Sequence, residues 1–477
     1  MRTTFWQREG DWDGQERARR ANLDTGLKIR TLRTVELGEP PDSQDPHGRK
    51  RATIVNHFWR RLADLPFPAL LMVPAILLQA CDRGGDPWQG SVTDSAGVTL
   101  VRNPATPVWA SGEAWTVTEE LRIGTVAGQP EYQFGQITFL DVAHDGTIYV
   151  MDMQAREVRA YDPEGTYLRT IGGPGSGPGE LSQQAPFVFV DREGGLVVPD
   201  MGNQRVSRYG PGGEPAGSFP IQMQSGVPTR WMLDRSGRLM AQLRGLDIPG
   251  MAALSEGDPI VVYDTTGAVT DTVAILPKGQ MLEGMTEERL SITLFAPEPV
   301  WDLAPDGSAV YAMNDRYRIL VNDPGGSLRR IITREVPRKS VEEADRNAIL
   351  RLMREQYEQF GVPPAQAEQI MAGIGFAPYY PAFAQLLVGP GETLWVQRIR
   401  SARDMADAAG ELAEFDPQDL ASPEWEILDA EGRYLGVVAL PDRFNPVAVR
   451  GDDLYGVWRD ELDVQYVMRV RVHRAGG

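Results

Sequence analysis

Apolar and polar residues alternate in a unit that recurs six times between residue 139 and the C-terminal end of the chain. Each unit contains an alternating apolar run, a turn that includes glycine, and a second apolar run, which predicts two antiparallel strands joined by a tight turn. The six units are residues 139–150, 187–198, 231–241, 300–312, 383–396 and 444–457. Repetition of one strand pair predicts a set of similar β-sheets arranged around a common axis.

A second turn signal follows five of the six units. In four of them an aspartate is followed three positions later by a glycine, and residues 209–213 form a glycine-rich variant. The four pairs are Asp162 with Gly165, Asp264 with Gly267, Asp323 with Gly326, and Asp429 with Gly432. In such turns the aspartate accepts backbone N–H groups and the glycine adopts positive φ, so each sheet is expected to have a second hairpin.

The sixth unit reaches the end of the chain without this second turn. The missing Asp-x-x-Gly sequence lies at residues 94–97, and the apolar run 98–101 follows it. We therefore expect an N-terminal strand, residues 98–101, to complete the last sheet, because ring closure pairs edges that would otherwise be open. The predicted fold is all-β: a six-bladed β-propeller over residues 94–477, with its N-terminal strand closing the last blade and a small helical insertion.

The helical insertion is predicted at residues 340–383. Ser340 and Glu343 match a capping box, and an apolar stripe then falls on one helical face; Gly361 ends this helix and Pro363-Pro364 begins a second one, which runs through Ala372. The stripe consists of Ile349, Leu350, Met353, Tyr357 and Phe360. A second insertion, residues 401–423, is acidic and alanine-rich and is expected to form a loop at the rim.

A dense aromatic segment follows the predicted helices. Its rings, Phe376, Tyr379, Tyr380 and Phe383, are the candidate ligand-binding residues. Two interpretations remain open for them: the rings pack the helices onto the propeller, or they form a lid or a recognition wall beside a binding mouth.

The N-terminal region has the layout of an export signal. Arg60 and Arg61 precede an apolar stretch that ends Leu78-Gln79-Ala80-Cys81, which resembles the lipobox of bacterial lipoproteins. The resemblance implies lipidation of Cys81 and a lipoprotein that is membrane-anchored in the cell envelope, facing the periplasm or the exterior. We expect a signal segment at residues 55–81 and a linker at 82–93. Residues 1–54 are either a polar extension or lie upstream of a translation start near Val55.

The first two predicted blades resemble NHL repeats. The residues that carry the resemblance are 172–181, 191–199 and 200–206, and the other blades keep only the general pattern of TolB-like six-bladed propellers. In NHL repeats the positions of Asp200 and Asn203 are mostly turn caps, and the position of Arg205 is mostly structural. The first blade keeps Asp152 but has Ala155 where the repeat has asparagine.

Charge and residue usage exclude several classes of function. The chain has a formal net charge of -18, and no cluster of basic and aromatic residues follows Cys81, so we expect no nucleic-acid partner. Cys81 is the only cysteine, and His144 and His473 are the only histidines after it. Both histidines are expected at the surface, so a zinc site or a Ser-His-Asp triad is not supported and no catalytic residue is assigned.

Calcium is the one cofactor left as an alternative, because propellers of the gluconolactonase type hold it on the axis with carboxylate and amide oxygens. Candidates on the inner strands are Asp141, Asp302, Gln385 and Asn445. The leading hypothesis needs no metal or other cofactor: a binding module for a protein, peptide or glycan. The alternative is a calcium-dependent hydrolase, lactonase or lyase. Three or more converging axial oxygen ligands would favour the enzyme, and an apolar or plugged channel would favour binding.

Overall fold

The computed structural model describes residues 88–110, 112–223, 226–245, 257–281, 291–406 and 417–474, all within the compact unit Asp82–Gly477. The predictions for the extension, the signal segment and Cys81 lie outside the described residues. No helix in the described ranges is both long and apolar enough to cross a membrane.

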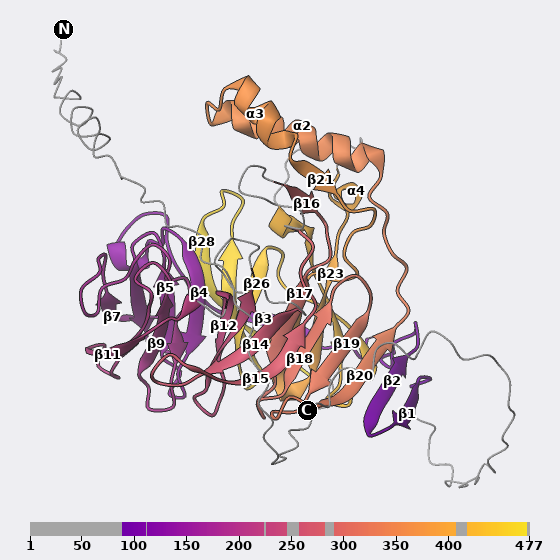
Figure 1. Cartoon of the computed structure of the whole chain (residues 1–477), viewed down its shortest axis with the longest axis horizontal. Coiled ribbons are helices and arrows are strands. Elements are labelled where there is room, and N and C mark those ends of the chain that lie inside the picture. Colours follow the sequence, from indigo (N-terminus) through magenta and orange to yellow (C-terminus); the bar gives the residue numbers. More distant parts are fainter. Residues whose placement is uncertain are drawn as a thin grey trace, which may run out of the picture. The chain divides into compact units, whose positions relative to one another are not determined.

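The unit is a six-bladed β-propeller, in which four-stranded antiparallel sheets are arranged in sequence order around an axis (Figure 1). The first three blades follow one another directly. Blade 1 contains β4 (Ile137–Val142), β5 (Ile148–Asp152), β6 (Glu157–Tyr161) and β7 (Tyr167–Gly172). Blade 2 contains β8 (Phe189–Val190), β9 (Leu196–Asp200), β10 (Arg205–Tyr209) and β11 (Pro215–Pro220). Blade 3 contains β12 (Val227–Leu233), β13 (Leu239–Arg244), β14 (Asp258–Tyr263) and β15 (Val269–Leu276).

The other three blades include the N-terminal strands. Blade 4 contains β17 (Pro299–Leu303), β18 (Ala309–Met313), β19 (Arg318–Asn322) and β20 (Leu328–Arg334), and it is extended by β2 (Val98–Asn103) and β1 (Ser91–Ser95). Blade 5 contains β22 (Leu386–Val388), β23 (Leu394–Ile399), β24 (Ala421–Leu428) and β25 (Tyr434–Ala439). Blade 6 contains β26 (Phe444–Arg450), β27 (Asp453–Arg459), β28 (Gln465–His473) and β3 (Thr116–Ile123). Short 3-10 helices lie at Pro130–Tyr132, Pro390–Glu392 and Pro417–Leu420.

The hydrophobic core consists of six layers, each between two consecutive blades. One layer joins Tyr149 and Met151 of blade 1 to Val198 of blade 2, and the same kind of cluster recurs at every junction, including that between blades 6 and 1. Middle strands are therefore buried on both faces: all five residues of β5 are buried. Their continuous apolar sequences follow from this double burial, since each face is covered by a neighbouring sheet.

The ring is closed by β3, which pairs antiparallel with β28 from Ile123 opposite Val467 to Thr116 opposite His473. Closure of the last blade by an N-terminal strand is thus confirmed, but the strand predicted for this position is wrong. Residues 98–101 lie in β2, which pairs in parallel with β20 of blade 4, and residues 94–97 form the end of β1 and the turn that joins it to β2. An Asp-x-x-Gly turn specifies a hairpin but not the sheet that receives it, and Val101 is buried in the layer between blades 4 and 5.

The N-terminal segment between β1 and β3 crosses the outer edges of blades 4, 5 and 6. Asn103 at the end of β2 donates to Gly432 O (2.8 Å) and accepts from Tyr434 N (2.7 Å) in blade 5. Trp109 N then donates to Leu435 O (2.8 Å) before the chain enters β3. The predicted linker was expected to reach residue 93, but the ordered fold begins earlier, because Trp88 packs on the core and donates to Asn103 Oδ1.

The predicted Asp-x-x-Gly hairpin turns are confirmed, and their glycines also serve the contact between blades. In blade 3, Asp264 accepts Thr266 N (2.8 Å) and Ala268 N (3.0 Å), and Gly267 has φ +82°. A Cβ on Gly267 would lie 2.0 Å from Pro220 O in the outer strand of blade 2. Four further turn glycines face the outer strand of the preceding blade in the same way: Gly165, Gly213, Gly326 and Gly432.

The residues that carry the NHL resemblance have the structural roles predicted for them. Asp200 accepts Ser182 N (3.0 Å) and Asn203 N (3.1 Å), so it caps the turn. Asn203 Nδ2 donates to Gly175 O (3.0 Å), and the Arg205 guanidinium donates to three carbonyl oxygens in residues 176–180. These groups hold the long loop between blades 1 and 2 in place.

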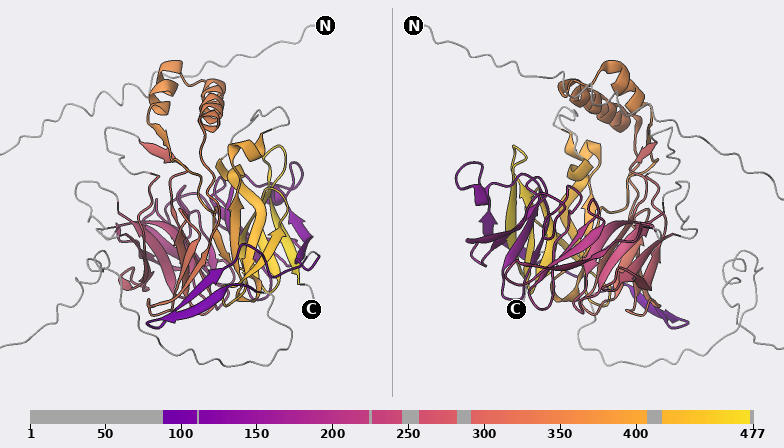
Figure 2. Two further views of the ribbon diagram at one scale, coloured as in Figure 1. Left: turned by 90° about the vertical axis from the view of Figure 1, so that its right-hand side faces the viewer. Right: turned by 60° about the vertical axis from the view of Figure 1, so that its left-hand side comes forward.

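The helical insertion stands off one face of the ring, here called the upper face (Figure 2). It contains α2 (Glu343–Gln359), α3 (Pro364–Met371) and β21 (Ile374–Phe376); β21 pairs in parallel with β16 (Ile292–Leu294), and α4 (Ala402–Met405) packs against this group. We call residues 340–380 the helical arm.

Two details of the arm differ from the prediction. The capping box of α2 is formed by Glu342 and Asp345, because the backbone of Ser340 forms a β-bridge with Tyr379 and the helix can begin only afterwards. The predicted apolar face is buried at Ile349 but ends before Phe360, which is 75% exposed at the helix end.

Two alanine substitutions in blade 3 separate backbone strain from contact between blades. Gly237 (φ +84°) has no atom within 4 Å of a built Cβ, so Gly237→Ala should cost only the strain of positive φ, about 1 kcal/mol. Gly267→Ala adds a clash with the Pro220 carbonyl and should cost about 3 kcal/mol or more. Denaturant unfolding of both variants measures the difference, and equal losses would contradict a tight turn-to-blade contact.

Candidate functional site

A pocket of about 480 Å³ lies between blades 4 and 5 on the upper face, at the base of the helical arm. The chain leaves the propeller for the arm at Lys339 and returns at Pro381, and both residues line this blade-4/5 pocket. The ends of β23 and β24 form the opposite wall. This volume is in the range of small-molecule or side-chain binding sites.

The floor of the pocket is apolar. Tyr317 and Phe383 meet edge to face, with ring centroids 5.6 Å apart, and Val336, Val396 and Ile399 complete the surface. Tyr317, Phe383 and Val396 also belong to the core layer between the two blades, so this floor is rigid.

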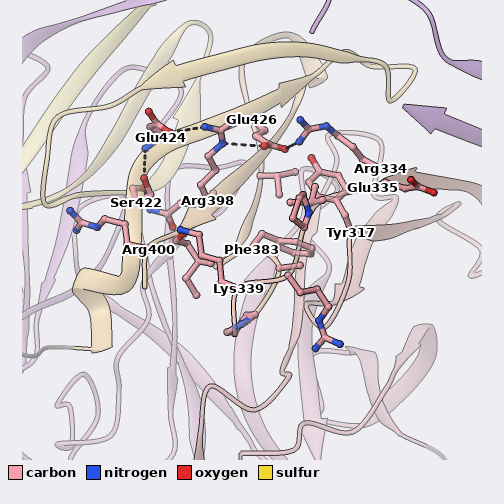
Figure 3. A pocket seen from close by; sticks show the side chains of 18 of the residues that line it. Tyr317, Arg334, Glu335, Lys339, Phe383, Arg398, Arg400, Ser422, Glu424 and Glu426 are labelled. Carbon is pink, nitrogen blue, oxygen red and sulfur yellow. Dashed lines mark hydrogen bonds and ion pairs between the residues drawn. The ribbon is translucent and has the colours of Figure 1, made fainter. Parts of the chain in front are cut away.

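One wall is a network of charges with a buried centre at Arg334 and Glu426 (Figure 3). Arg334 and Arg398 reach Glu426 from opposite sides, at 2.5 and 3.0 Å, and Arg398 also contacts Glu424 at 2.7 Å. The side chains of Arg334 and Glu426 are only 9% and 6% exposed. Arg334 further donates to the carbonyl oxygen of Ala105 (3.2 Å), and its guanidinium lies 4.0 Å above the Tyr434 ring. Removing one partner from such a network leaves a buried charge unpaired, so its members fix the shape of the wall.

Two buried polar atoms of the pocket residues have no hydrogen-bond partner of ordinary geometry among the described residues: the Tyr317 hydroxyl and Gln397 Oε1. Burial raises the pKa of Tyr317 well above its ordinary value, and the Glu426 carboxylate nearby raises it further. Tyr317 therefore stays protonated and uncharged at physiological pH, and the floor contributes no negative charge to the site.

The rim of the pocket is exposed. Lys339 Nζ pairs with Asp404 at 2.5 Å, with both side chains 44% exposed. The Arg338 guanidinium lies 4.1 Å above the ring of Tyr379. The rim thus joins a positive charge to an accessible aromatic ring, a combination that is typical of recognition surfaces.

A second pocket of about 340 Å³ lies beside the first, between blades 5 and 6, and includes Gln385 and Asn445 of the inner strands. Gln397, Arg400 and Ser422 line both pockets. The two pockets are therefore neighbours across the upper ends of β23 and β24, and Arg400 lies at their boundary.

The four residues predicted to bind ligand have different environments. Tyr380 and Phe383 are each 1% exposed. The Tyr380 hydroxyl accepts Ala402 N (3.1 Å), its ring lies 4.6 Å from Phe295, and burial raises its pKa to about 12. Phe376 is half-buried against Phe295, whereas Tyr379 is 40% exposed.

Packing of the arm thus accounts for Tyr380 and Phe376, while Phe383 lines the pocket floor and Tyr379 faces the rim. Their role toward a ligand stays a prediction. Sequence analysis missed Arg334, Arg398 and Glu426, because charged residues at strand ends are usually solvated and no local pattern joins these three.

The axial candidates for calcium are engaged in contacts between blades. Asp141 accepts Val142 N (2.7 Å) and, from blade 2, Val190 N (2.9 Å); Asp302 in blade 4 repeats the arrangement with Leu303 N (2.9 Å) and Val388 N (2.6 Å). Burial raises the pKa of both carboxyls, and a nearby arginine, Arg450 for Asp141 and Arg230 for Asp302, opposes the rise together with these hydrogen bonds. Each aspartate therefore joins two neighbouring inner strands.

The other two candidates pair with each other, since Gln385 Nε2 donates to Asn445 Oδ1 (3.0 Å). The described ranges contain no group of three or more His, Cys, Asp or Glu side chains that could hold a metal ion. His144 and His473 are exposed, as predicted. A calcium site at the axis stays a prediction, with no such cluster behind it in the described part of the chain.

Comparison with known proteins agrees with the architecture. The DUF5128 family model, described as a 6-bladed beta-propeller, matches residues 129–218, which contain blade 1 and most of blade 2. No curated protein matches the chain.

Several solved structures are similar in fold. An exported protein of Bacteroides fragilis NCTC 9343 is 10% identical, covers 78% of this chain and 99% of its own, and has a TM-score of 0.46. A member of the DUF4221 family from Bacteroides vulgatus is 12% identical, with coverages of 76% and 99% and the same TM-score. Virginiamycin B lyase from Staphylococcus aureus is 10% identical, with coverages of 75% and 99% and a TM-score of 0.37. At these identities and TM-scores the likeness carries no argument about activity or ligand.

Alanine substitution of two neighbouring tyrosines tests whether one ring packs the arm and the other belongs to the rim of the pocket. Tyr380→Ala removes a buried ring and should lower the free energy of unfolding by about 3–5 kcal/mol. Tyr379→Ala removes an exposed ring that stacks on Arg338 and should cost about 1 kcal/mol or less. Chemical denaturation followed by tryptophan fluorescence measures both values. Equal losses would contradict the division between core and rim.

Proposed function

We propose that this chain is a lipid-anchored, extracytoplasmic binding module that captures a segment of a protein or peptide in the blade-4/5 pocket. The observation that carries the proposal is the pocket itself, which combines a rigid apolar floor, a fixed charged wall and an exposed Arg338–Tyr379 rim. Such a combination suits an apolar side chain flanked by polar backbone. A glycan is the other partner class expected from the sequence.

The charged groups of the pocket favour binding over catalysis. Glu426 accepts bonds from two arginines, and Lys339 is paired with Asp404, so these side chains are held as neutralised pairs. A general acid or base needs a proton-transfer group that faces the substrate with a tuned pKa, and Tyr317 is buried in its neutral form. The pocket therefore offers shape and fixed charge rather than a reacting group.

The proposed location rests on the lipobox-like residues 78–81 and on the NHL-like and TolB-like pattern of the blades. Trp88 packs on the propeller only seven residues after Cys81. Seven residues span at most about 24 Å, so a lipidated Cys81 would hold the edge of blade 4 close to the membrane. A partner would then be captured near the membrane surface.

Selection of a random peptide library on the full-length protein tests pocket binding. We expect enriched peptides whose binding is weakened more than about tenfold by Ala105→Trp, which places a bulky ring at the pocket mouth. Ala110→Trp is the matched control, because Ala110 is exposed in the same N-terminal segment but does not line the pocket.

Fluorescence anisotropy of the selected peptides gives the two affinities, and thermal melts check that both variants fold. Peptides that bind both tryptophan variants equally well would contradict the pocket as the binding site. If no peptide is enriched at all, the proposal of a peptide-binding module is also wrong.

Substitution of Cys81 tests the anchor. Cys81→Ser removes the thiol that would be acylated, so the protein should move from the membrane fraction to the soluble fraction of the cell envelope. Mass spectrometry should show the loss of the acyl chains. Unchanged fractionation together with an unchanged mass would rule out lipidation at this residue.

A further inference from the structure

The two neighbouring pockets of the upper face adjoin each other, because Gln397, Arg400 and Ser422 line both. We call the blade-4/5 and blade-5/6 pockets together the arginine groove. It runs from the base of the helical arm, across the upper end of blade 5, to Gln385 and Asn445 at the inner strands of blades 5 and 6.

Arg400, at the centre of the groove, is held by carbonyl groups. Its Nε and Nη2 donate to Asp419 O at 2.9 and 2.5 Å. Within the described ranges it forms one ion pair, with Asp442 at 3.8 Å, and the side chain of Asp442 is 65% exposed. Carbonyl dipoles fix the orientation of the guanidinium without cancelling its charge, and an exposed ion pair at this distance is weak.

Arg338 and Arg443 extend the same arrangement to the two ends of the groove. Arg338 is oriented by the Tyr379 ring, and Arg443 donates to the carbonyl oxygen of Asp460 (2.9 Å). In the described ranges neither guanidinium has a carboxylate within 4.0 Å, and both residues are exposed. Among the described residues, Arg338 and Arg443 are thus oriented without a carboxylate partner, and Arg400 has only the weak pair with Asp442.

The other arginines of the pocket provide the contrast. Arg334 and Arg398 are neutralised by Glu426 and Glu424, so they build the wall. Where an arginine is needed only for structure, this site supplies a carboxylate. Among the described residues, Arg338 and Arg443 have no such pair and Arg400 has only the long one to Asp442, so these three arginines keep positive charge toward the groove.

We propose that the arginine groove binds an extended acidic peptide segment, with carboxylates on Arg338, Arg400 and Arg443 and an apolar side chain on the floor of the blade-4/5 pocket. This inference rests on the proposed function and names the chemistry of the partner. Guanidinium groups suit carboxylates because the two planar groups form paired hydrogen bonds. The apolar floor favours a peptide over an acidic glycan, since a glycan carries no apolar side chain to fill it.

Labelled peptides of alternating residues test the charge of the partner on the full-length protein. The probes are (Glu-Leu)₄, (Gln-Leu)₄ and (Lys-Leu)₄, with Kd measured by fluorescence anisotropy. We expect the acidic peptide to bind about tenfold more tightly than the glutamine peptide, and the difference to shrink between about 50 mM and about 300 mM NaCl.

Variants locate this charge effect. Arg400→Gln should weaken binding of the acidic peptide about tenfold, and Arg400→Lys, which keeps the charge but loses the paired hydrogen bonds, should restore only part of the affinity. Arg338→Gln is a second variant. Because Arg338 is exposed, its substitution should leave folding unchanged. Arg235→Gln is the matched control, an exposed arginine outside the groove that removes the same charge.

Equal affinities for the acidic and glutamine peptides would overturn the proposal of an acidic partner. So would an Arg400→Gln variant that binds the acidic peptide as tightly as Arg235→Gln does. If Ala105→Trp still abolished binding of the glutamine peptide in that case, the proposed peptide-binding function would stand, but without a preference for acidic peptides. Loss of all pocket-dependent peptide binding would instead overturn the proposed function. Stronger competition by an oligogalacturonate than by the acidic peptide would replace the peptide with an acidic glycan.

Discussion

The burial of apolar side chains between consecutive blades is the interaction on which the rest of this structure depends. Every blade covers one face of the next, and six such layers close on themselves where Ile123 and Val467 meet residues of blade 1. Burial contributes roughly 25 cal/mol for each Å² of apolar surface removed from water, so no blade is stable with a face uncovered. The hydrogen bonds of Asp141 and Asp302 and the turn glycines act within this frame, because they set how closely neighbouring blades approach.

The same layers explain why the fold could be predicted from the sequence. Continuous apolar strands and regularly spaced turns are local signals, and residues such as Asp264 and Gly267 act within a few positions of themselves. The identity of the closing strand was not predictable in this way. Residues 98–101 and β3 both follow turns near the N-terminus, and only the fit of Val101 into the layer between blades 4 and 5 distinguishes them.

The candidate site depends on contacts that no local pattern contains. Arg334 and Glu426 lie 92 positions apart, and their pairing arises because blades 4 and 5 meet there. The aromatic segment at the end of the arm was recognisable from composition, but composition could not show which of its rings are buried and which are exposed. Tyr380 turns into the packing of the arm while its neighbour Tyr379 turns outward, and the β-bridge of Tyr379 with Ser340 sets this alternation.

Closure by β3 has a consequence for the order of events during synthesis. Thr118 and His473, which meet in the last blade, lie 355 positions apart. The N-terminal strand therefore waits unpaired until nearly the whole chain has emerged, and contacts of such long range form slowly because the connecting loop must first be ordered. The chain stays an open arc during this interval, with β3 and the face of blade 6 both available to wrong partners.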